Sequence, residues 1–586
     1  MRKKSYSPYQ GNLNRFDRHF FDGKEIFTYI GSGELGGKAH GLAHMKGVLE
    51  SNFKERYAPD IEVEIPTLTV ITTDLFDKFM KQNNLYEIAY SGERDDLIAL
   101  AFQQADLPVQ LVGDLRALVQ QIHTPLAVRS SSMLEDAMFE PFASVYATKM
   151  VSNNQPDADS RFRTLIEAVK FVYASTFFKS AGDYMKVTHH STRDEKMAVI
   201  IQEVVGERFG ERFYPHISGV MRSYNFYPTG NAAPEEGVVD LALGLGRIIV
   251  DDGVSWSYSP AYPQANPPYK SIGDLLKESQ LKFWAINMGK PSAYDPIIRV
   301  TEHMHKYGIE ESEYDGTLRH IASTYDPQDD RIRTGTGIKG PRVIDFAPIL
   351  KTDLLPLNDL LTNLLKACED AVGSMVEIEF AVNLDRERCT PAKFGFLQVR
   401  PMVVTRAEVE IGDGEMSGDR VLLASETVLG NGVLDSIRDV VFVDPDRFDV
   451  KATHAIASEL DSVNRTLVAS KRPYLLIGLG RWGTTDTLAG IPVEFGQISG
   501  AKAIVELSLP GSGSTLSQGS HFFHNVTSFK IFYFSVHHWE EYGIDWKWLK
   551  EQTMVSEGTY VRHVELPSPL MIKVDGKNGR GVIRHD

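Results

Sequence analysis

Two short segments far apart in the chain carry residue types that bind phosphate and a divalent cation. Lys38 directly follows a pair of glycines, and far downstream Glu379 precedes Gln398 and Arg400. A lysine after a glycine turn is a mobile point charge for phosphate oxygens. Carboxylate and amide oxygens on strands are suited to hold Mg²⁺ against the same phosphates. Together, the two segments predict the two walls of a nucleotide phosphate site.

The composition excludes several broad classes of protein. The 586 residues predict about three to four domains, and a hydrophobic share of 42% is ample for packed cores. A formal net charge of -16 argues against a general electrostatic grip on nucleic acid or an anionic membrane. The two cysteines are too few for a disulfide framework or a thiolate metal cluster, which favours a reducing compartment, the cytoplasm. No segment approaches the roughly 20 apolar residues that cross a bilayer, and no secretory signal is expected.

Strand and helix patterns alternate along the first 400 or so residues, which predicts an α/β (α+β) fold. Residues 376–383 and 394–399 are typical of a hairpin that would carry the second half of the site. Residues 259–340 have a poorer signal and are interpreted as an insertion or a mobile subdomain, with a helix at 272–286. The other strands are predicted at 61–72, 126–129, 197–205, 218–226, 238–243 and 343–346, and the other helices at 73–80, 161–178 and 354–372.

A series of short motifs in one order gives a family resemblance. Residues 26–406 resemble the N-terminal nucleotide-binding domain of phosphoenolpyruvate synthase and pyruvate phosphate dikinase, a relative of the ATP-grasp fold. The resemblance implies a two-lobed domain that uses ATP and Mg²⁺. The matching motifs are Gly36-Gly37-Lys38-Ala39, Ile65-Pro66, Ile71-Thr72-Thr73, Ala127 to Ser132 with Glu135-Asp136, Ile200 to Val205, Ser218 to Met221, Gly244-Leu245-Gly246, Glu377 to Phe380 and Leu397 to Pro401.

The resemblance implies a role for each matched residue. Lys38 and Arg129 supply positive charge against the phosphates, and Arg400 adds a forked donor set, so these three are the predicted catalytic groups. Phosphoryl transfer asks mainly for positioning and charge neutralisation, which suits such residues. Glu379 and Gln398 are the predicted Mg²⁺ ligands, because this ion uses only one or two protein ligands beside the phosphates and keeps several waters.

Four further residues are predicted to contact the nucleotide. Gln202 and Glu203 lie on the strand and hinge that would contact adenine, and Thr148 fits a hydroxyl-to-phosphate role. Ser144 stands where the family has a glycine, so a side chain there narrows the approach of backbone to phosphate and affects lid geometry or ATP affinity. Arg247 is a second departure, at a position where an acidic residue is expected.

The remainder of the chain departs from the complete enzymes. We expect residues 1–25 to be an N-terminal extension, 407–418 a glycine-containing linker and 419–586 a separate α/β domain. The complete enzymes pass phosphate to a histidine on a swivelling domain and then to pyruvate in a TIM barrel of roughly 250 residues. Because 168 residues follow Gly418, no such barrel is expected. Residues 480–486 and 490–493 resemble the swivelling domain's loop, with Asp486 near the position of its histidine, so a degenerate swivelling domain is an alternative.

Two histidines are low-ranking candidates for a phosphate acceptor. His454 is flanked by small residues in a helical run and is more typical of an ordinary surface or core histidine. His521 lies in residues 517–525, where polar groups among aromatics suit a small-molecule pocket. The favoured interpretation of that segment is a turn that enters a strand, with structural histidines.

These observations predict an ATP-dependent phosphotransferase that uses Mg²⁺ and ATP to phosphorylate an unidentified acceptor, either a small molecule or a partner protein. The alternative is a nucleotide-responsive regulatory or scaffold protein that binds ATP without turnover. The cations at 38, 129 and 400 favour chemistry, whereas Ser144 and the missing histidine motif favour regulation.

Overall fold

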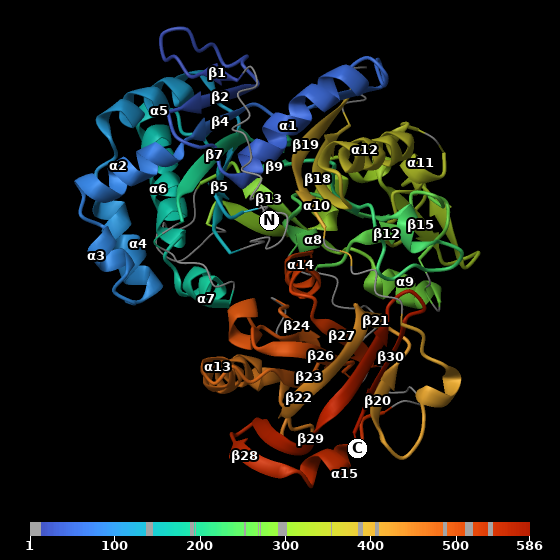
Figure 1. Cartoon of the computed structure of the whole chain (residues 1–586). Coiled ribbons are helices and arrows are strands. Elements are labelled where there is room, and N and C mark those ends of the chain that lie inside the picture. Colours follow the sequence, from blue (N-terminus) through green and yellow to red (C-terminus); the bar gives the residue numbers. More distant parts are fainter. Residues whose placement is uncertain are drawn as a thin grey trace. The chain divides into compact units, whose positions relative to one another are not determined.

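The computed structural model divides the chain into two compact units, whose elements are labelled in Figure 1. The first unit comprises residues 1–223, 236–249 and 254–401, and the second comprises 224–235, 250–253 and 402–586. The second unit therefore takes up two short excursions of the chain that interrupt the first. The structure describes residues 13–135, 145–187, 193, 195–250, 253–267, 269, 271–290, 302–352, 354–384, 391–402, 404, 409–484, 489–509, 520–536 and 543–585.

The first unit contains a six-stranded sheet in the order β1-β2-β4-β7-β5-β6. Every residue of its central strand β7 before Glu203 is buried, and the first five are apolar, as expected for a strand covered on both faces. Helices α2 (Thr73–Gln82) and α6 (Ala158–Ser175) pack against this sheet, and α4 (Asp95–Gln104) and α5 (Val109–Gln121) pack on α6. The strands are β1 (Asn14–Arg15), β2 (Phe27–Ile30), β4 (Leu68–Ile71), β5 (Leu126–Ser132), β6 (Thr148–Val151) and β7 (Met197–Glu203).

A second six-stranded sheet of the same unit has the order β12-β11-β10-β18-β19-β3. The predicted hairpin is confirmed as β18 (Val376–Asn383) and β19 (Ala392–Pro401), which pair antiparallel. Helix α1 (Gly37–Asn52) packs on β19 and also on β5, so it contacts both sheets, and α12 (Leu357–Val372) packs on β18 (Figure 1). The other strands are β3 (Ile61–Glu64), β10 (Ile217–Arg222), β11 (Val238–Ala242) and β12 (Trp256–Tyr258).

Two sequence predictions in this unit are wrong in detail. Residues 61–72 form two strands in different sheets, because Pro66 between β3 and β4 has no N–H to donate to a ladder. The predicted helix at 272–286 is α9 (Ile272–Glu278), capped by Ser271, followed by strand β13 (Lys282–Asn287). The buried and half-buried aromatic residues of β13 suit a strand better than a helix.

The described part of residues 259–340 contributes to the core of the first unit. Phe283, Ala285 and Ile321 belong to the same cluster of buried side chains as the strands of the second sheet. Two small sheets are formed here, in the orders β14-β13-β9-β8 and β16-β15-β17. Their further elements are β8 (Glu207–Phe209), β9 (Arg212–Tyr214), β14 (Met304–Gly308), α10 (Ile309–Tyr314), β15 (Ala322–Asp326), β16 (Arg331–Thr334) and β17 (Arg342–Ile344); α3 (Tyr86–Ala89), α7 (Lys179–Val187), α8 (Arg247–Val250) and α11 (Ala347–Leu350) complete the helices described up to Pro401.

The second unit is built on a nine-stranded sheet with its own core. Four of its strands, β22, β23, β26 and β27, are parallel neighbours, and α13 (Thr453–Ala469) and α14 (Ser520–Ser528) lie between them in sequence. A turn was predicted for residues 517–525. This prediction is wrong for residues 520–525, which the structure describes and which form the start of α14. The strands are β20 (Val421–Ser425), β21 (Val428–Leu429), β22 (Asn431–Val443), β23 (Tyr474–Leu479), β26 (Ala501–Leu507), β27 (Phe532–Val536), β28 (Thr553–Glu557), β29 (Val561–Asp575) and β30 (Arg580–Arg584), with β24 (Arg481–Trp482), β25 (Gly490–Ile491) and α15 (Trp546–Lys550) outside the sheet. In the part of the chain that the structure describes, every helix is too short or too polar to span a membrane.

Candidate active site

The glycine pair before Lys38 is required by close contact with the end of β5. Gly36 has a φ of 77°, and a Cβ there would lie 1.7 Å from the carbonyl oxygen of Ser131. A Cβ on Gly37 would lie 1.6 Å from the carbonyl oxygen of Glu135. No side chain fits at either position, so the glycines let the N-terminus of α1 press against the segment that follows β5.

Lys38 is held at this N-terminus by the same segment. Its Nζ donates to Glu135 Oε1 at 2.6 Å and to Ser130 Oγ at 3.2 Å, and Ser130 Oγ also donates to Glu135 Oε1 at 2.9 Å. The Lys38 side chain is 12% exposed, whereas the Glu135 side chain is fully buried. Ser131 Oγ accepts from the backbone N–H of Ala39 at 3.1 Å, which fixes the first turn of α1. The lysine is thereby tied to Ser130, the residue after Arg129 in β5.

Arg129 connects the two sheets of the first unit. From β5 its Nη1 donates to Gln202 Oε1 at 3.2 Å and to the carbonyl oxygen of Leu397 at 2.9 Å. Its Nη2 donates to Gln398 Oε1 at 2.6 Å and lies 3.7 Å from Glu379 Oε2. Four oxygens, two of them on β19 and one on β18, therefore surround one guanidinium.

The hairpin presents its polar side chains on one face. Glu377 is the cross-strand partner of Arg400, and Glu379 is the partner of Gln398. Residues directly opposite in an antiparallel pair share a face, as do residues two apart in a strand. Arg400 Nε donates to Glu377 Oε1 at 2.6 Å, and its Nη2 donates to Glu379 Oε1 at 3.1 Å. The Arg400 side chain is only 3% exposed, so its guanidinium is directed at carboxylates of the hairpin.

The row of charges continues on the neighbouring strands β10 and β11. Arg222 Nε donates to Glu377 Oε2 at 2.7 Å, and its Nη1 donates to Asp240 Oδ2 at 2.8 Å. Burial lowers the pKa of the Arg222 guanidinium, but the attraction of Glu377 and Asp240 outweighs burial and leaves that pKa above its ordinary value. We call the alternating row the charge ladder; its members are Asp240, Arg222, Glu377, Arg400, Glu379 and Arg129.

Sequence reasoning did not select four residues of this network as site residues. Glu377 could have been found, because its spacing of two from Glu379 places both carboxylates on one face of a strand. Glu135 lies within a quoted motif, but nothing in that motif indicates that its carboxylate holds Lys38. Arg222 and Asp240 carry no comparable signal, since only the pairing of β10 with β18 and β11 brings them to the ladder.

The structure brings some of the predicted nucleotide contacts to Arg129. Thr148 is the cross-strand partner of Arg129, and Gln202 lies two residues from its other partner, Ile200, so these side chains share a face of the first sheet. Glu203 lies on the opposite face, where its Oε2 accepts from Thr124 Oγ1 at 2.8 Å. Burial raises the pKa of the Glu203 carboxyl.

The remaining candidates are not among the described contacts of this network. Ser144 lies outside the described residues. His454 is exposed at the start of α13, which agrees with an ordinary surface histidine. His521 is the second residue of α14, in the second unit. Asp486 also lies outside the described residues.

The donor set around Arg129 is chemically suited to Mg²⁺. Glu379 Oε2 and Gln398 Oε1 converge on one cationic nitrogen, Arg129 Nη2. A carboxylate oxygen and an amide oxygen are hard ligands of the kind this ion takes beside waters and phosphates. Among the described residues, no group of three or more His, Cys, Asp or Glu side chains is placed to hold a metal.

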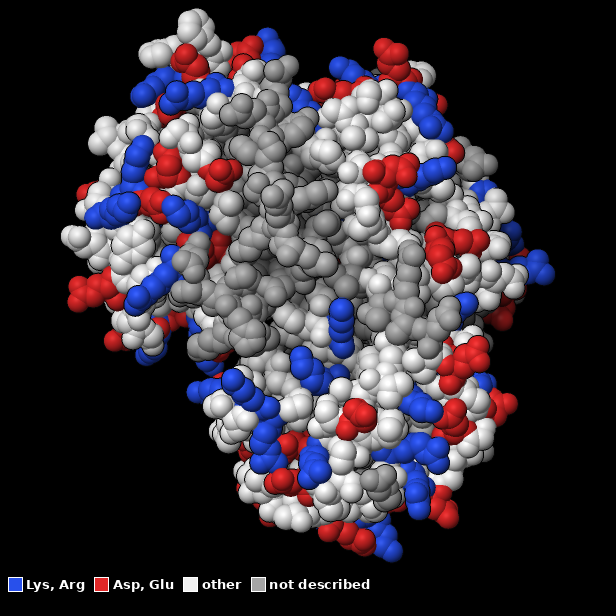
Figure 2. Space-filling model, in the orientation of Figure 1, with Lys and Arg blue, Asp and Glu red and all other residues white. Residues whose placement is uncertain are grey.

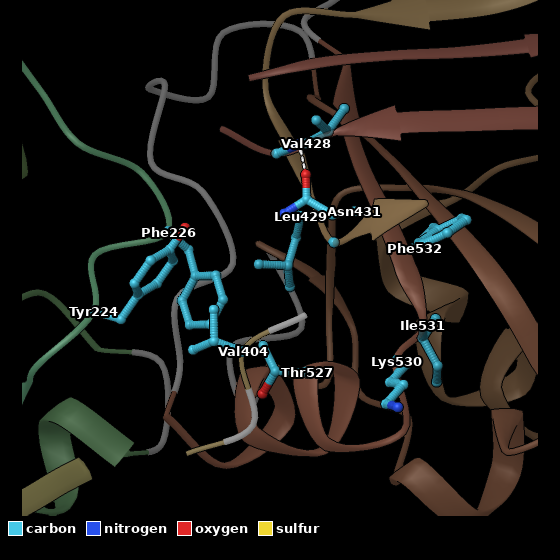
Figure 3. A pocket seen from close by; sticks show the side chains of 12 residues that line it. Tyr224, Phe226, Val404, Val428, Leu429, Asn431, Thr527, Lys530, Ile531 and Phe532 are labelled. Carbon is cyan, nitrogen blue, oxygen red and sulfur yellow. Dashed lines mark hydrogen bonds between the residues drawn. The ribbon is translucent and has the colours of Figure 1, made fainter. Parts of the chain in front are cut away.

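A pocket in the second unit offers different chemistry. Its lining includes Tyr224 and Phe226 from the first excursion, and Figure 3 shows their rings on one side of the pocket. Among the twelve described residues that line it, Lys530 alone carries a charge. The other nine are Val404, Val428, Leu429, Gly430, Asn431, Thr527, Ile531, Phe532 and Gly576. This lining contains no carboxylate or histidine, so it has no carboxylate or imidazole base to activate a phosphate acceptor.

Charges elsewhere on the chain do not form a single field. On the face drawn in Figure 2, basic and acidic side chains are intermixed over the described surface rather than gathered in one broad basic area. The cationic groups gathered at the site, Lys38, Arg129, Arg400 and Arg222, are largely buried and have acidic partners close by.

The two sheets and the cation-rich site on α1, β5 and the hairpin define a mixed α/β domain suited to a polyphosphate ligand. Residues 32–417 match the family described as pyruvate phosphate dikinase, AMP/ATP-binding domain. The chain belongs to this family and carries its ATP-binding domain. The resemblance seen in the sequence is thereby confirmed. A comparison with curated proteins found no match.

Proposed function

We propose that this protein is a phosphotransferase that uses Mg²⁺ and ATP to phosphorylate an acceptor that remains to be identified. One observation carries the proposal. Arg129 from one sheet meets Glu379 and Gln398 from the other, so a cation and a pair of oxygen ligands are held together at one place. Lys38 is bonded to Ser130, which follows Arg129 in β5, so the lysine lies next to this place. Phosphoryl transfer needs this combination of positioned positive charge and metal ligands.

The residues divide into two kinds of role. Lys38 and Arg129, at 12% and 11% side-chain exposure, are the groups that meet the phosphate oxygens. Glu379 and Gln398 hold Mg²⁺, which when bound supplies neutralising charge to the phosphates. Thr148 and Gln202 share the face of Arg129 and line the same region.

Arg400 is proposed as a positioning residue. It was expected to contact phosphate directly, but its guanidinium is buried and lies between Glu377 and Glu379. By donating to Glu379 Oε1 it fixes the orientation of that carboxylate and leaves Oε2 directed at the metal position. The substitution Arg400→Lys keeps the charge and loses the fork, so it tests orientation apart from charge.

A regulatory protein that binds ATP without turnover is the second candidate. It is favoured by the internal pairing of the site's cations, since Lys38 is bonded to Glu135 and Arg400 to Glu377 and Glu379. A cation that is already paired with a carboxylate adds less binding energy for an entering phosphate than a free cation, because it must give up its carboxylate or share itself between the two anions.

One experiment separates the two candidates. The protein is incubated with Mg²⁺ and ATP labelled at the β or the γ phosphate, and AMP, ADP and acid-labile labelled protein are measured. The phosphotransferase releases a nucleotide product, and label on the protein identifies an acceptor group within the chain. If ATP binds and neither AMP nor ADP forms, with or without candidate acceptors, the phosphotransferase proposal is wrong and the regulatory candidate stands.

A further inference from the structure

The members of the charge ladder are not held equally firmly. Arg400 and Arg222 each contact Glu377 at 2.7 Å or less, and their side chains are 3% and 6% exposed. Arg129 lies 3.7 Å from its only carboxylate partner in the ladder, Glu379, and is 11% exposed. Coulomb attraction falls with distance and with access of water, so the Arg129 pair is the weakest of the row. It is therefore the ion pair of the row that costs least to separate, and the phosphates must also replace the hydrogen bonds of Arg129 to Gln202, Leu397 and Gln398.

The two oxygens of Glu379 serve different cations. Oε1 accepts from Arg400 Nη2 at 3.1 Å, while Oε2 faces Arg129 Nη2. When Arg129 moves away, Glu379 stays oriented by Arg400 and Oε2 becomes available. Gln398 Oε1, which accepts from the same Nη2 at 2.6 Å, becomes available in the same movement.

We propose that Arg129 occupies the divalent-cation position in the nucleotide-free protein, so that the metal enters only together with a nucleotide whose phosphates take over Arg129. This inference rests on the proposed function of the site. The guanidinium and the metal use the same two oxygens and carry charge of the same sign, so they exclude each other. Phosphate oxygens replace the acceptors that Arg129 leaves, because forked donors suit them well.

The consequence is an order of events built into the site. Without nucleotide, Arg129 neutralises Glu379 and keeps a free divalent cation out. With nucleotide, one movement places Arg129 on the phosphates and frees Glu379 Oε2 and Gln398 Oε1 for the metal. Glu379 is thus never left with Arg400 as its only cationic neighbour.

Binding of Mn²⁺ in the absence of nucleotide tests the inference without any turnover. Free Mn²⁺ is followed by electron paramagnetic resonance as it is titrated into the full chain. The wild-type protein is expected to show no site tighter than about millimolar. Arg129→Gln is expected to gain one site at least about tenfold tighter, because a like charge has been removed from beside the metal. Arg129→Met, which is also neutral, is expected to gain the same site, and Glu379→Gln added to Arg129→Gln is expected to abolish it.

A matched control separates local exclusion from the effect of net charge. Arg208→Gln removes one positive charge from β8, where Arg208 Nε donates only to the carbonyl oxygen of Gly210 at 2.9 Å among the contacts described. It is expected to leave Mn²⁺ binding unchanged. Thermal unfolding of each variant shows whether it is folded.

Two results would overturn the inference. One is a tight Mn²⁺ site in the wild-type protein without nucleotide that Glu379→Gln removes, a measurement that needs no Arg129 variant. The other is folded Arg129→Gln and Arg129→Met proteins that gain no Mn²⁺ site. Calorimetric titration of the wild-type protein with ATP, with and without Mg²⁺, tests the nucleotide site separately, and release of AMP or ADP from labelled ATP tests the proposed function, so the failures are distinguishable.

Discussion

Removal of the charge of Glu377 is expected to destabilise the first unit strongly. The carboxylate lies between two guanidiniums, with contacts of 2.5 and 2.6 Å to Arg400 and 2.7 Å to Arg222, and its side chain is 2% exposed. Glu377→Gln keeps the shape of the side chain but leaves the ladder with one excess buried positive charge. Loss of one partner of a buried pair typically costs about 3–5 kcal/mol, because the charge left behind has lost both water and its counter-ion. A tenfold change in an equilibrium constant corresponds to about 1.4 kcal/mol. The equilibrium constant for opening of the first unit from its closed, native form should therefore rise by roughly a hundredfold to a few thousandfold.

The buried thiol of Cys368 supplies the assay for Glu377→Gln. Cys368 lies on α12 in the core of the first unit with no exposed surface, and burial raises the pKa of its thiol to about 12. In a Cys389→Ser background, the rate at which a disulfide reagent labels Cys368 therefore reports opening of the first unit under native conditions. Glu313→Gln is the control, since its partner Arg342 lies 2.6 Å away but the Glu313 side chain is 45% exposed. Such a surface pair is worth about 0–1 kcal/mol. If Glu377→Gln labels within about fivefold of the parent, a change of about 1 kcal/mol, the reasoning about the ladder is refuted.

Three further predictions address the rest of the site. Gly37→Ala should abolish ATP binding measured by calorimetry, because its Cβ would meet Glu135 O at 1.6 Å. The control Gly47→Ala on the same helix meets nothing within 4 Å, so it should bind ATP normally and raise the free energy of unfolding in urea by up to about 1 kcal/mol. Normal ATP binding by Gly37→Ala would contradict the close packing of α1. Lys38→Ala should weaken ATP binding at least about tenfold in the same titration, while the exposed Lys24→Ala should not change it; equal affinities would remove Lys38 from the site. Burial raises the pKa of Asp74, but hydrogen bonds from Thr72 Oγ1 and from the backbone N–H groups of Ser32 and Gly33 outweigh it and lower that pKa to about 2 from an ordinary 3.8. A carboxyl whose folded-state pKa is lowered stabilises the fold above pH 3.8, and this stability is lost as the pH falls through 2. Asp74→Asn should therefore destabilise the protein at pH 7 and not below pH 2, and a difference in stability that persists below pH 2 would disprove the assignment.

Local patterns were sufficient to predict much of the first unit. Alternation in residues 376–383 and 394–399 predicted the hairpin, and with it the meeting of Glu379 and Gln398, because both depend on the period of a strand. The short apolar run before Arg129 predicted β5, because such a run is typical of a strand that is buried on both faces. The error at 61–72 came from treating Pro66 as tolerable within a strand.

Long-range pairing accounts for what the sequence could not supply. Arg222 and Asp240 reach the charge ladder only because β10 pairs with β18, more than 150 residues later in the chain. Arg400 meets its two carboxylates through the predicted hairpin itself, but its residue type and its place in the motif suggested a phosphate ligand and not a partner for Glu377 and Glu379. A close match to a family motif thus identified the residue without revealing which neighbour it faces.

The path of the chain between β10 and β11 limits how the two units can be prepared separately. The chain leaves the first unit after Ser223 and returns to it at Glu236. An ion pair between Arg222 on β10 and Asp240 on β11 joins the two strands that flank this excursion. A protein ended at Pro401 would keep this excursion, with its half-buried Tyr227, and lose the rest of the second unit, including Glu506 near that tyrosine. Such a fragment would expose aromatic residues and tend to associate. Replacing 224–235 by a short polar turn between Ser223 and Glu236 would be the first step toward an ATP-binding domain that can be studied alone.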